Sequence, residues 1–409
     1  MNIWIINQYA GSPYYGMNYR SYYLAKAFVQ KGHKVQLFAS SFSHLFKHLP
    51  QTDGTFTDEK VDGIDYIWVK TPSYSNSKSI KRIVNMLIFM FKLFFFKTST
   101  KARPDIIIIS SLSLFPVLNA LLWSRRLKVP FIFEVRDIWP LTLVELGSVS
   151  ATHPLVKLLG WIEKLGYKKA SRVVSVLPNA LPHMLSKGLA EEKFIHIPNG
   201  VDLSEVQNSQ PLAPEVKAKV PTNKFIVGYV GTLGIANAMQ YLLDTAKIVQ
   251  KHNKIHFVIV GSGGEKSALE DFAKKEHLTN VTFIDAINKT TVQSMLSMFD
   301  ICYIGWHKKE IYRFGVSANK LFDYMYSAKP ILHSISVEND LVTQAQCGLV
   351  VPAEDVKMIA EAVVSLSKTT QEECQLLGQN GYNYVKKHHS YEKLGEKYFE
   401  LIKDTISTH

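Results

Sequence analysis

The chain has little of the chemistry that stabilises small secreted domains or holds metal ions. Its 409 residues include only three cysteines, Cys302, Cys347 and Cys374, which lie far apart and show no paired metal-ligand spacing. This pattern argues against a disulfide scaffold or a structural zinc site and indicates a reducing cytosol. The sequence also contains no Asp-x-Asp pair and no His/Asp cluster. We therefore expect no metal ion and no bound cofactor.

The sequence also lacks a hydrophobic run long enough for a membrane span. The most apolar segment, residues 78–101, is shorter than a span and is interrupted by Lys92. Two interpretations stay open for its basic flanks and its Phe, Met and Leu residues: an interfacial helix on an anionic membrane, or a helix that covers the sheet of its own domain. Both can hold on different faces. The apolar residues 2–7 are too few for a signal peptide and indicate a buried strand.

Positive charge exceeds negative charge. Lys and Arg outnumber Asp and Glu by 47 to 35, which gives a formal net charge of +12. The excess favours an anionic partner such as nucleic acid, an acidic membrane leaflet or a phosphorylated lipid. No recognisable nucleic-acid motif accompanies it, so we expect no nucleic-acid partner.

Short β-branched runs alternate with helical patterns along a chain that is longer than one hydrophobic core usually supports. Apolar strands separated by helices indicate parallel sheets that are covered on both faces. The predicted strands form two series: residues 3–7, 35–39, 64–69, 106–110, 131–135 and 173–176, then 225–230, 256–260, 281–284, 301–304, 331–333 and 348–351. We predict an α/β protein with two doubly wound, Rossmann-like domains.

Between the two series, residues 203–223 are polar, contain three prolines and show no sustained apolar period. We place the interdomain linker there. In open parallel sheets, ligands bind outside the carboxyl ends of the strands, so we expect two such edges to face each other across a cleft. The loops at these ends are residues 11–16, 136–140, 231–234, 261–264 and 306–315.

The most informative segment is residues 315–325, Gly-Val-Ser-Ala-Asn-Lys-Leu-Phe-Asp-Tyr-Met. It reads as a helix that opens with Ser317, Asn319 and Lys320. The backbone N–H groups and the positive dipole end of such a helix bind anions, and Lys320 adds a charge. Asp323, one turn further on, can accept bonds from hydroxyl groups. A diphosphate beside sugar hydroxyls matches this combination, which predicts a nucleotide-activated sugar as ligand.

This segment resembles the nucleotide-sugar motif of glycosyltransferase family 4, in its WbuB-type bacterial polysaccharide branch. Further matches lie at Gly16 and Arg20, at Val-Arg-Asp-Ile-Trp-Pro (135–140), at Pro-Asn-Gly-Val-Asp (198–202) and at Gly-Thr-Leu-Gly (231–234). Each short match alone is weak. Their common order and spacing extend the resemblance over nearly the whole chain.

The resemblance implies the GT-B architecture, with an acceptor-binding, membrane-associating domain over 1–205 and a nucleotide-sugar domain over 206–388. A final helix within 389–409 is expected to cross back to the first domain. The implied activity is a retaining, metal-independent transfer of a sugar, an N-acetylated hexosamine or a deoxyhexosamine, from a UDP-sugar to a polyprenyl-diphosphate-linked glycan. Such a hexosyltransferase would act in O-antigen or capsule synthesis, in the cytoplasm at the inner membrane.

The family motifs also assign site residues. Arg136, Asp137 and Lys320 are the predicted catalytic residues, because Arg136 can contact the sugar or leaving diphosphate and Asp137 can orient it or an acceptor hydroxyl. The predicted donor-binding residues are Gly16, Arg20, Gly231, Thr232, Gly234, Gly261, Ser317, Asn319, Lys320 and Asp323. We expect Glu134 to point to the opposite face by strand alternation, which gives it a smaller part.

Three positions depart from the family pattern. Asp323 stands in place of a Glu, Ile235 stands where relatives carry an Arg that contacts the diphosphate, and Gly315 replaces the first Glu of a paired-Glu motif. Lys320 and Arg20 must then carry more of the charge. Lys308, Lys309 and Arg313 can compensate from a nearby loop, or they form an ordinary solvated loop.

Other readings stay open at this point. Residues 261–264, Gly-Ser-Gly-Gly, either cradle a phosphate or form a plain strand-to-helix turn. The alternative for Arg136 and Asp137 is a salt-bridged strand end. At the level of function, the alternatives are a GT-B nucleotide-sugar epimerase, for which no acid and base carboxylates are evident, and a catalytically inactive family member that acts as a membrane assembly subunit.

Overall fold

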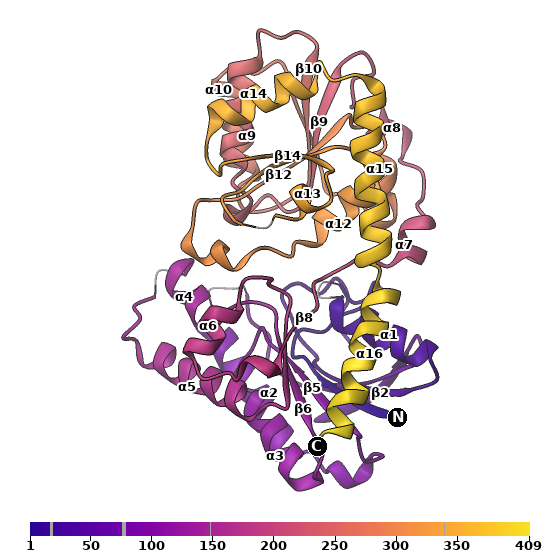
Figure 1. Ribbon diagram of the computed structural model, residues 1–409, viewed down its shortest axis with the longest axis vertical. Coiled ribbons are helices and arrows are strands. Elements are labelled where there is room, and N and C mark those ends of the chain that lie inside the picture. Colours follow the sequence, from indigo (N-terminus) through magenta and orange to yellow (C-terminus); the bar gives the residue numbers. More distant parts are fainter. Residues whose placement is uncertain (17–18, 76–78, 148, 339) are drawn as a thin grey trace. The chain divides into compact units, whose positions relative to one another are not determined.

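The computed structural model describes every residue except 17–18, 76–78, 148 and 339. The chain divides into two compact units: Met1–Asn199 together with Tyr391–His409, and Gly200–Ser390. Each unit contains one mainly parallel sheet with helices on both faces, as Figure 1 shows for each unit taken by itself. The boundaries lie a few residues from the predicted ones at 205/206 and 388/389. The final helix belongs to the first unit.

The first unit is built on an eight-stranded sheet with the order β3-β4-β2-β1-β5-β6-β7-β8. All neighbouring strands are parallel except the antiparallel pair β3 and β4. The strands are β1 (Asn2–Ile6), β2 (Lys34–Ser40), β3 (Phe56–Val61), β4 (Ile64–Val69), β5 (Ile106–Ser110), β6 (Phe131–Val135), β7 (Arg172–Ser175) and β8 (Phe194–His196). The six predicted strands are confirmed, whereas the edge strands β3 and β8 were missed. Neither has the continuous apolar run of a central strand.

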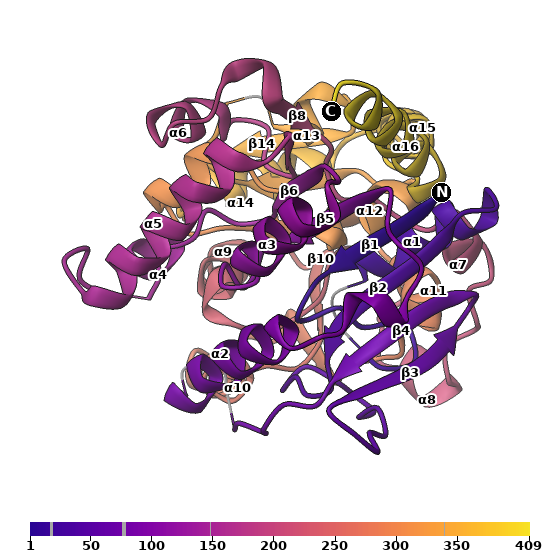
Figure 2. The ribbon, with the colours of Figure 1, turned by 90° about the horizontal axis from the view of Figure 1, so that it is seen from below.

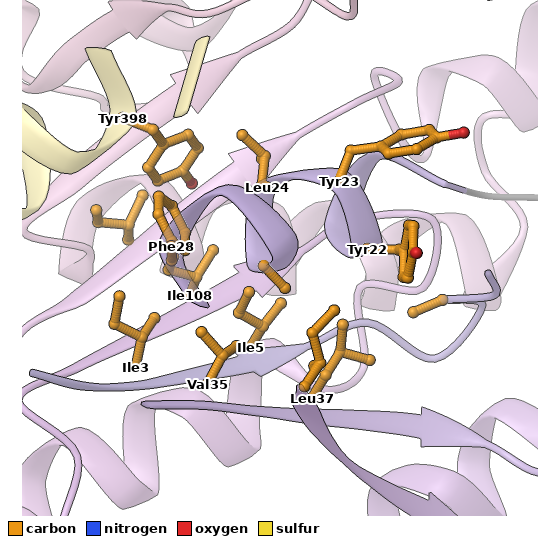
Figure 3. Close-up of a cluster of buried hydrophobic side chains, with 14 of the residues drawn as sticks. Ile3, Ile5, Tyr22, Tyr23, Leu24, Phe28, Val35, Leu37, Ile108 and Tyr398 are labelled. Atoms are coloured by element: carbon orange, nitrogen blue, oxygen red, sulfur yellow. The ribbon is translucent and has the colours of Figure 1, made fainter. Parts of the chain in front are cut away.

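The helices of this unit are α1 (Arg20–Gln30), α2 (Ile80–Phe94), α3 (Val117–Leu127), α4 (Leu141–Glu145), α5 (Pro154–Lys169), α6 (Leu181–Ser186) and α16 (Tyr391–Ser407). Figure 2 shows α2, α3 and α5 on one side of the sheet and α1 and α16 on the other. The second side packs through a core in which Phe28 of α1 meets Tyr398 of α16 at a centroid separation of 6.0 Å (Figure 3). Residues from both ends of the sequence thus share one core.

Helix α2 occupies most of the apolar segment whose role the sequence left open. Ser79 caps its N-terminus by accepting a bond from Lys81 N, and Phe89 and Leu93 are fully buried against the sheet. The helix therefore covers its own domain, one of the two interpretations. Lys78 lies outside the described residues. Within the part of the chain that the structure describes, no helix combines the length and apolar character needed to cross a bilayer.

The second unit has a six-stranded parallel sheet with the order β11-β10-β9-β12-β13-β14. Its strands, β9 (Phe225–Val230), β10 (Ile255–Val260), β11 (Val281–Ile284), β12 (Ile301–Gly305), β13 (Ile331–Ser334) and β14 (Gly348–Val351), confirm the second predicted series. One face packs against α9 (Met239–Val249) and α14 (Val356–Leu366). The other packs against α11 (Val292–Leu296), α12 (Asn319–Tyr326) and α15 (Gln371–His388). Helices α10 (Lys266–Lys275) and α13 (Leu341–Gln344) complete the unit.

The segment predicted to be an irregular linker, residues 203–223, is part of the second unit and contains two short helices, α7 (Leu203–Gln207) and α8 (Pro214–Lys217). Asp202 caps α7 by accepting a bond from Glu205 N at 3.0 Å, and Pro214 occupies the first position of α8, where its missing N–H costs nothing. Val206 and Val220 are buried in the core of the unit. Local capping and two buried valines therefore outweigh the polar composition of this segment.

Candidate active site

The sheet of the second unit reverses its order between β9 and β12. Strands β10 and β11 extend from one side of β9, and β12, β13 and β14 extend from the other. The loops that leave β9 and β12 therefore diverge and open a crevice at the carboxyl ends of these two strands, the usual ligand site of open parallel sheets. The loop after β12 leads into α12, which carries Lys320.

Lys320 lies at this switch point and is held by neutral oxygen atoms. Its Nζ donates to the Tyr229 hydroxyl at 2.7 Å and to the Asn237 side-chain oxygen at 2.5 Å. It also lies 4.5 Å from the centroid of the Tyr229 ring. Among the described residues, no carboxylate lies within ion-pair distance of Lys320. Lys320 is half-buried, and a cation partly removed from water without a counter-charge is unfavourable, so this site favours an incoming anion.

Burial lowers the pKa of Lys320 to about 7. Burial also raises the pKa of its neighbour Tyr229, so the phenol stays neutral and supplies no compensating charge. At neutral pH the amine of Lys320 is thus divided between its charged and neutral forms. An anion bound beside it would favour the charged form and raise the pKa again.

The two glycine-rich loops of the second unit lie against each other next to Lys320. A Cβ atom added at Gly231 would lie 3.2 Å from Lys320 Nζ, and one added at Gly261 would lie 1.9 Å from the Gly231 carbonyl oxygen. The loops are joined by a hydrogen bond from Leu233 N to the Ser262 carbonyl at 2.8 Å. Close backbone packing therefore accounts for Gly261, whereas at Gly231 the side chains of Tyr229 and Lys320 leave little room for a Cβ atom. The donor-binding roles of Gly231 and Gly261 stay predictions.

Two side chains hold Thr232, in the loop after β9, in place. Its carbonyl oxygen accepts bonds from the Tyr229 hydroxyl at 2.7 Å and from Asn237 Nδ2 at 2.9 Å. The two side chains that contact Lys320 therefore also fix the loop of residues 231–234, which includes Gly234. This arrangement brings the predicted residues of that loop and Lys320 into one cluster.

Helix α12 begins at Asn319, and its N-cap residue Ala318 provides no side-chain hydrogen bond. Its first turn contains no acidic residue. Asn319 is exposed and Ser317 is half-buried. The N-terminus of α12 therefore presents backbone N–H groups and a positive dipole end beside Lys320, as an anion site requires.

Asp323 has an ion-pair partner that the sequence did not reveal. Lys289 Nζ lies 2.6 Å from each carboxylate oxygen of Asp323, and the Asp323 side chain is buried. Lys289 comes from the loop after β11, far from Asp323 in sequence. The ion pair orients the carboxylate, and its predicted bonds to ribose hydroxyls would be made alongside Lys289.

In the first unit, Arg20 is held by the protein itself. Its side chain is 1% exposed, and Nε lies 2.9 Å from Glu134 Oε2. The remaining nitrogens donate to the carbonyls of Ile197 at 2.9 Å and Pro198 at 2.5 Å. Glu134 also accepts a bond from Ser110 Oγ at 2.8 Å. Glu134, to which we gave a smaller part, is therefore the central carboxylate of a buried network, and a diphosphate-binding role for Arg20 stays a prediction.

The other predicted residues of the first unit, Arg136, Asp137 and Gly16, lie in loops that follow its strands. Arg136 directly follows β6; its backbone N donates to Ser111 Oγ at 3.0 Å. Burial lowers the pKa of Arg136, and the charge of Glu134 opposes that shift. Asp137 is exposed. Gly16 has a φ of +111° and lies against the backbone of Leu45 and Lys47, a conformation and a contact that favour glycine.

Sequence reasoning missed three contact residues of the second unit: Tyr229, Asn237 and Lys289. Tyr229 lies in a strand that reads as core, and Asn237 lies two positions after Ile235, which is itself exposed. Only its place after the Gly-Thr-Leu-Gly loop could have drawn attention to Asn237. Lys308, Lys309 and Arg313 are exposed and make no contact with Lys320.

Within the described part of the chain, no group of three or more His, Cys, Asp or Glu side chains lies close enough together to hold a metal ion. Metal independence nevertheless stays a prediction about the reaction.

Comparison with known protein families identifies the family to which this chain belongs. Residues 14–205 match the family model described as "Glycosyltransferase Family 4", and residues 224–369 match the model "Glycosyl transferases group 1". The chain belongs to glycosyltransferase family 4. The predicted family, and with it a transferase enzyme, are confirmed.

Three relatives illustrate the similarity of this glycosyltransferase to known proteins. It is 21% identical over 287 residues to "Putative colanic acid biosynthesis glycosyl transferase WcaI" of Escherichia coli K12, covering 68% of this chain and 70% of WcaI. The structure of sucrose-phosphate synthase from Thermosynechococcus elongatus matches with a TM-score of 0.76 at 16% identity, covering 100% of both chains. That of Anabaena HepE in complex with UDP matches with a TM-score of 0.68 at 13% identity, covering 99% of this chain and 100% of HepE. The predicted GT-B fold is confirmed.

We predict that Lys320→Ala weakens binding of UDP and of a UDP-sugar while leaving free uridine unaffected. Loss of a charged contact costs about 1.5–3 kcal/mol, which is roughly ten- to hundredfold in affinity. Asp323→Ala should weaken all three ligands, because its predicted partner is the ribose. Calorimetric titration measures these affinities, and Lys308→Ala, an exposed lysine of the loop after β12, is the matched control. If Lys320→Ala left the UDP affinity unchanged, the prediction that α12 binds the diphosphate would be wrong.

The pKa of Lys320 adds a second readout to the same variants. Above about pH 7 the amine of Lys320 is mostly neutral in the free protein. A bound diphosphate favours the charged amine, so Lys320 should take up a proton when UDP binds. Between pH 7 and pH 9 the UDP affinity of the wild type should fall, and this fall should be absent in Lys320→Ala. Titrations in two buffers with different ionisation enthalpies count the proton directly.

We also predict that Arg20→Ala destabilises the protein by about 3–5 kcal/mol, since it leaves Glu134 as a buried unpaired charge. Arg172→Ala is the control: its ion pair with Asp404 is partly exposed, and its loss should cost about 0–1 kcal/mol. Denaturant unfolding compares the two. A stable Arg20→Ala variant with lowered UDP affinity would instead show that Arg20 serves the donor.

Proposed function

We propose that this glycosyltransferase moves a sugar from a UDP-sugar to a polyprenyl-diphosphate-linked glycan during synthesis of a surface polysaccharide of the O-antigen or capsule type. The observation that carries the proposal is the amine of Lys320, which lies at the switch point of a parallel sheet and whose partners among the described residues are neutral oxygens. A nucleoside diphosphate supplies the missing negative charge there. The likeness to HepE, solved with UDP, supports UDP as the nucleotide.

The proposed chemistry breaks the bond between the anomeric carbon of the sugar and the β-phosphate oxygen of UDP. A new bond forms between that carbon and an acceptor hydroxyl, on the same face of the sugar. The hydroxyl proton passes to the departing phosphate oxygen, so the products are UDP and the extended glycan. Lys320 and the N-terminus of α12 stabilise the negative charge that develops on the leaving group.

The polysaccharide assignment is supported by the resemblance to WcaI, whose name places it in colanic acid biosynthesis. Among sugars, an N-acetylated hexosamine or a deoxyhexosamine is the proposed group, following the branch that the sequence motifs resemble. A lipid-linked acceptor requires the enzyme to work at a membrane surface.

The outer face of α2 supports that location. Ile80, Val84, Phe91 and Phe95 follow one another at spacings of four, seven and four residues and so share one side of the helix. All four are exposed, Ile80 and Phe95 to 79%. Lys81 and Lys92 lie along one edge of this stripe, where Lys92 Nζ donates to the Lys70 carbonyl at 2.6 Å, and the net charge of the chain is +12. An exposed apolar stripe with a basic edge fits the surface of an anionic bilayer, with Lys side chains at the head groups.

The central experiment is a transfer assay with UDP-sugars and a prenyl-diphosphate-linked glycan, run in excess EDTA. We expect transfer to persist, because Lys320 and the helix terminus supply the positive charge that a divalent ion supplies elsewhere. Abolition by EDTA with rescue by magnesium or manganese would contradict metal independence. Epimerised UDP-sugar as the only product would favour the epimerase alternative, and absence of any turnover with intact UDP binding would favour the inactive assembly subunit.

For the membrane surface, we predict that Phe91→Ser with Phe95→Ser releases the protein from anionic vesicles without changing UDP affinity. Binding of the wild type should weaken as salt screens the basic residues. Vesicle co-sedimentation measures both effects. Leu376→Ser removes an equally exposed apolar side chain from α15 and serves as the control. Retention of the double variant on vesicles, or equal release of the control, would count against this face.

A further inference from the structure

The first unit contains a cavity of about 770 Å³ that the proposed donor chemistry does not use. It lies among α2, the loop after β5, α4 and the start of α5. Its apolar walls include Met86, Leu112, Leu143 and Leu159. A mostly apolar cavity of this size with a few polar groups is typical of a small-molecule site.

Two residues of the cavity wall, Ser113 and Trp139, each have a polar side-chain atom without a hydrogen-bond partner among the described residues. Ser113 Oγ and Trp139 Nε1 are both buried, and neither makes a hydrogen bond to any described residue. Ser113 is only 4% exposed. Buried hydroxyl and indole N–H groups are normally satisfied, and leaving them unsatisfied is costly. Two such groups on one cavity indicate a ligand with hydrogen-bond acceptors.

Positive charge lines the same cavity. Arg82 and Ser79, from the first turn of α2, belong to its wall. Arg82 Nε donates to the neutral Tyr9 hydroxyl at 3.2 Å, and its guanidinium lies 5.4 Å from the centroid of the Tyr9 ring. The first turn of α2 contains no acidic residue. Helix dipole, guanidinium, indole N–H and hydroxyl together form a set of donors for an anionic group.

We propose that this cavity binds the diphosphate and the adjoining isoprenoid units of the lipid-linked acceptor. The phosphate oxygens accept bonds from Trp139, Ser113 and Arg82, and the branched hydrocarbon packs against Met86, Leu143 and Leu159. Leu146 of the cavity wall is 44% exposed, so the remaining lipid can leave beside α4. The assignment rests on the proposed function, because it names the place where the lipid of that acceptor is held.

The test uses farnesyl diphosphate, a short water-soluble prenyl diphosphate, with the full chain in calorimetric titrations. Trp139→Phe keeps an aromatic ring and removes the N–H. We expect it to weaken farnesyl diphosphate about tenfold, the effect of losing one hydrogen bond to a charged group. The control Trp161→Phe makes the same change on the outer side of α5, where Trp161 is 55% exposed, and should leave the affinity unchanged.

The stability of the free protein provides an independent readout. Because Trp139 Nε1 has no hydrogen-bond partner among the described residues, its removal should leave the unfolding midpoint unchanged or slightly raised. A lowered midpoint would show that the N–H serves the fold, and this would overturn the proposal. Ser113→Ala, a second small change, should repeat both results.

Fragments of the ligand test the two ends of the cavity. Farnesyl diphosphate should bind more tightly than either inorganic diphosphate or farnesol, because only it fills both parts. Equal affinity for inorganic diphosphate would leave only an anion site, and equal competition by lysophosphatidylglycerol would indicate a general lipid pocket. Either result overturns the assignment.

UDP titration of the same samples separates this proposal from the proposed function. Farnesyl diphosphate binding that depends on Trp139, without any sugar transfer, would sustain the cavity assignment and overturn the proposed reaction. Transfer to a prenyl-linked glycan that proceeds equally well in Trp139→Phe would sustain the reaction and overturn the cavity assignment.

Discussion

A parallel sheet that is covered on both faces leaves only the ends of its strands for polar chemistry. Both units of this protein are built under that constraint. The central strands are mostly apolar, and the two charged clusters described above lie where strands stop and loops begin. The Arg20–Glu134 network lies at the carboxyl ends of β5 and β6, and Lys320 lies beside the carboxyl end of β9. The architecture therefore decides where a site can be, and the loops decide what it binds.

Two cations, the buried Arg20 and the half-buried Lys320, show how differently the charge of a side chain at such a strand end can be balanced. Arg20 has a carboxylate and two backbone carbonyls, so its charge is balanced within the first unit. Lys320 has a phenol and an amide oxygen, so its charge is not balanced. The first arrangement stabilises a fold. The second holds a lysine whose preferred protonation state depends on what is bound beside it, and this makes it suited to a ligand that arrives and leaves with negative charge.

The strand series was predictable because buried parallel strands leave continuous apolar runs in the sequence. The edge strand β3, Phe-Thr-Asp-Glu-Lys-Val, has no such run, and the predicted linker turned out to hold two capped helices. The position of Lys320 near a helix start was also predictable from its motif. Its partners Tyr229 and Asn237 were not, since a tyrosine in a strand reads as core and an asparagine in a turn reads as solvated. The ion pair between Lys289 and Asp323 joins two loops that only the tertiary fold brings together.

The connectivity of the first unit has a consequence for biosynthesis. Helix α16 supplies Tyr398 and Ile402 to a core that otherwise comes from the first two hundred residues, and the whole second unit is encoded between these parts. On the ribosome the second unit is a continuous stretch that can fold as soon as it emerges. The first unit must wait, with the apolar side of α1 uncovered, until translation reaches its last helix. The nascent chain thus completes its later-encoded domain first, and during that interval the earlier one depends on shielding from aggregation.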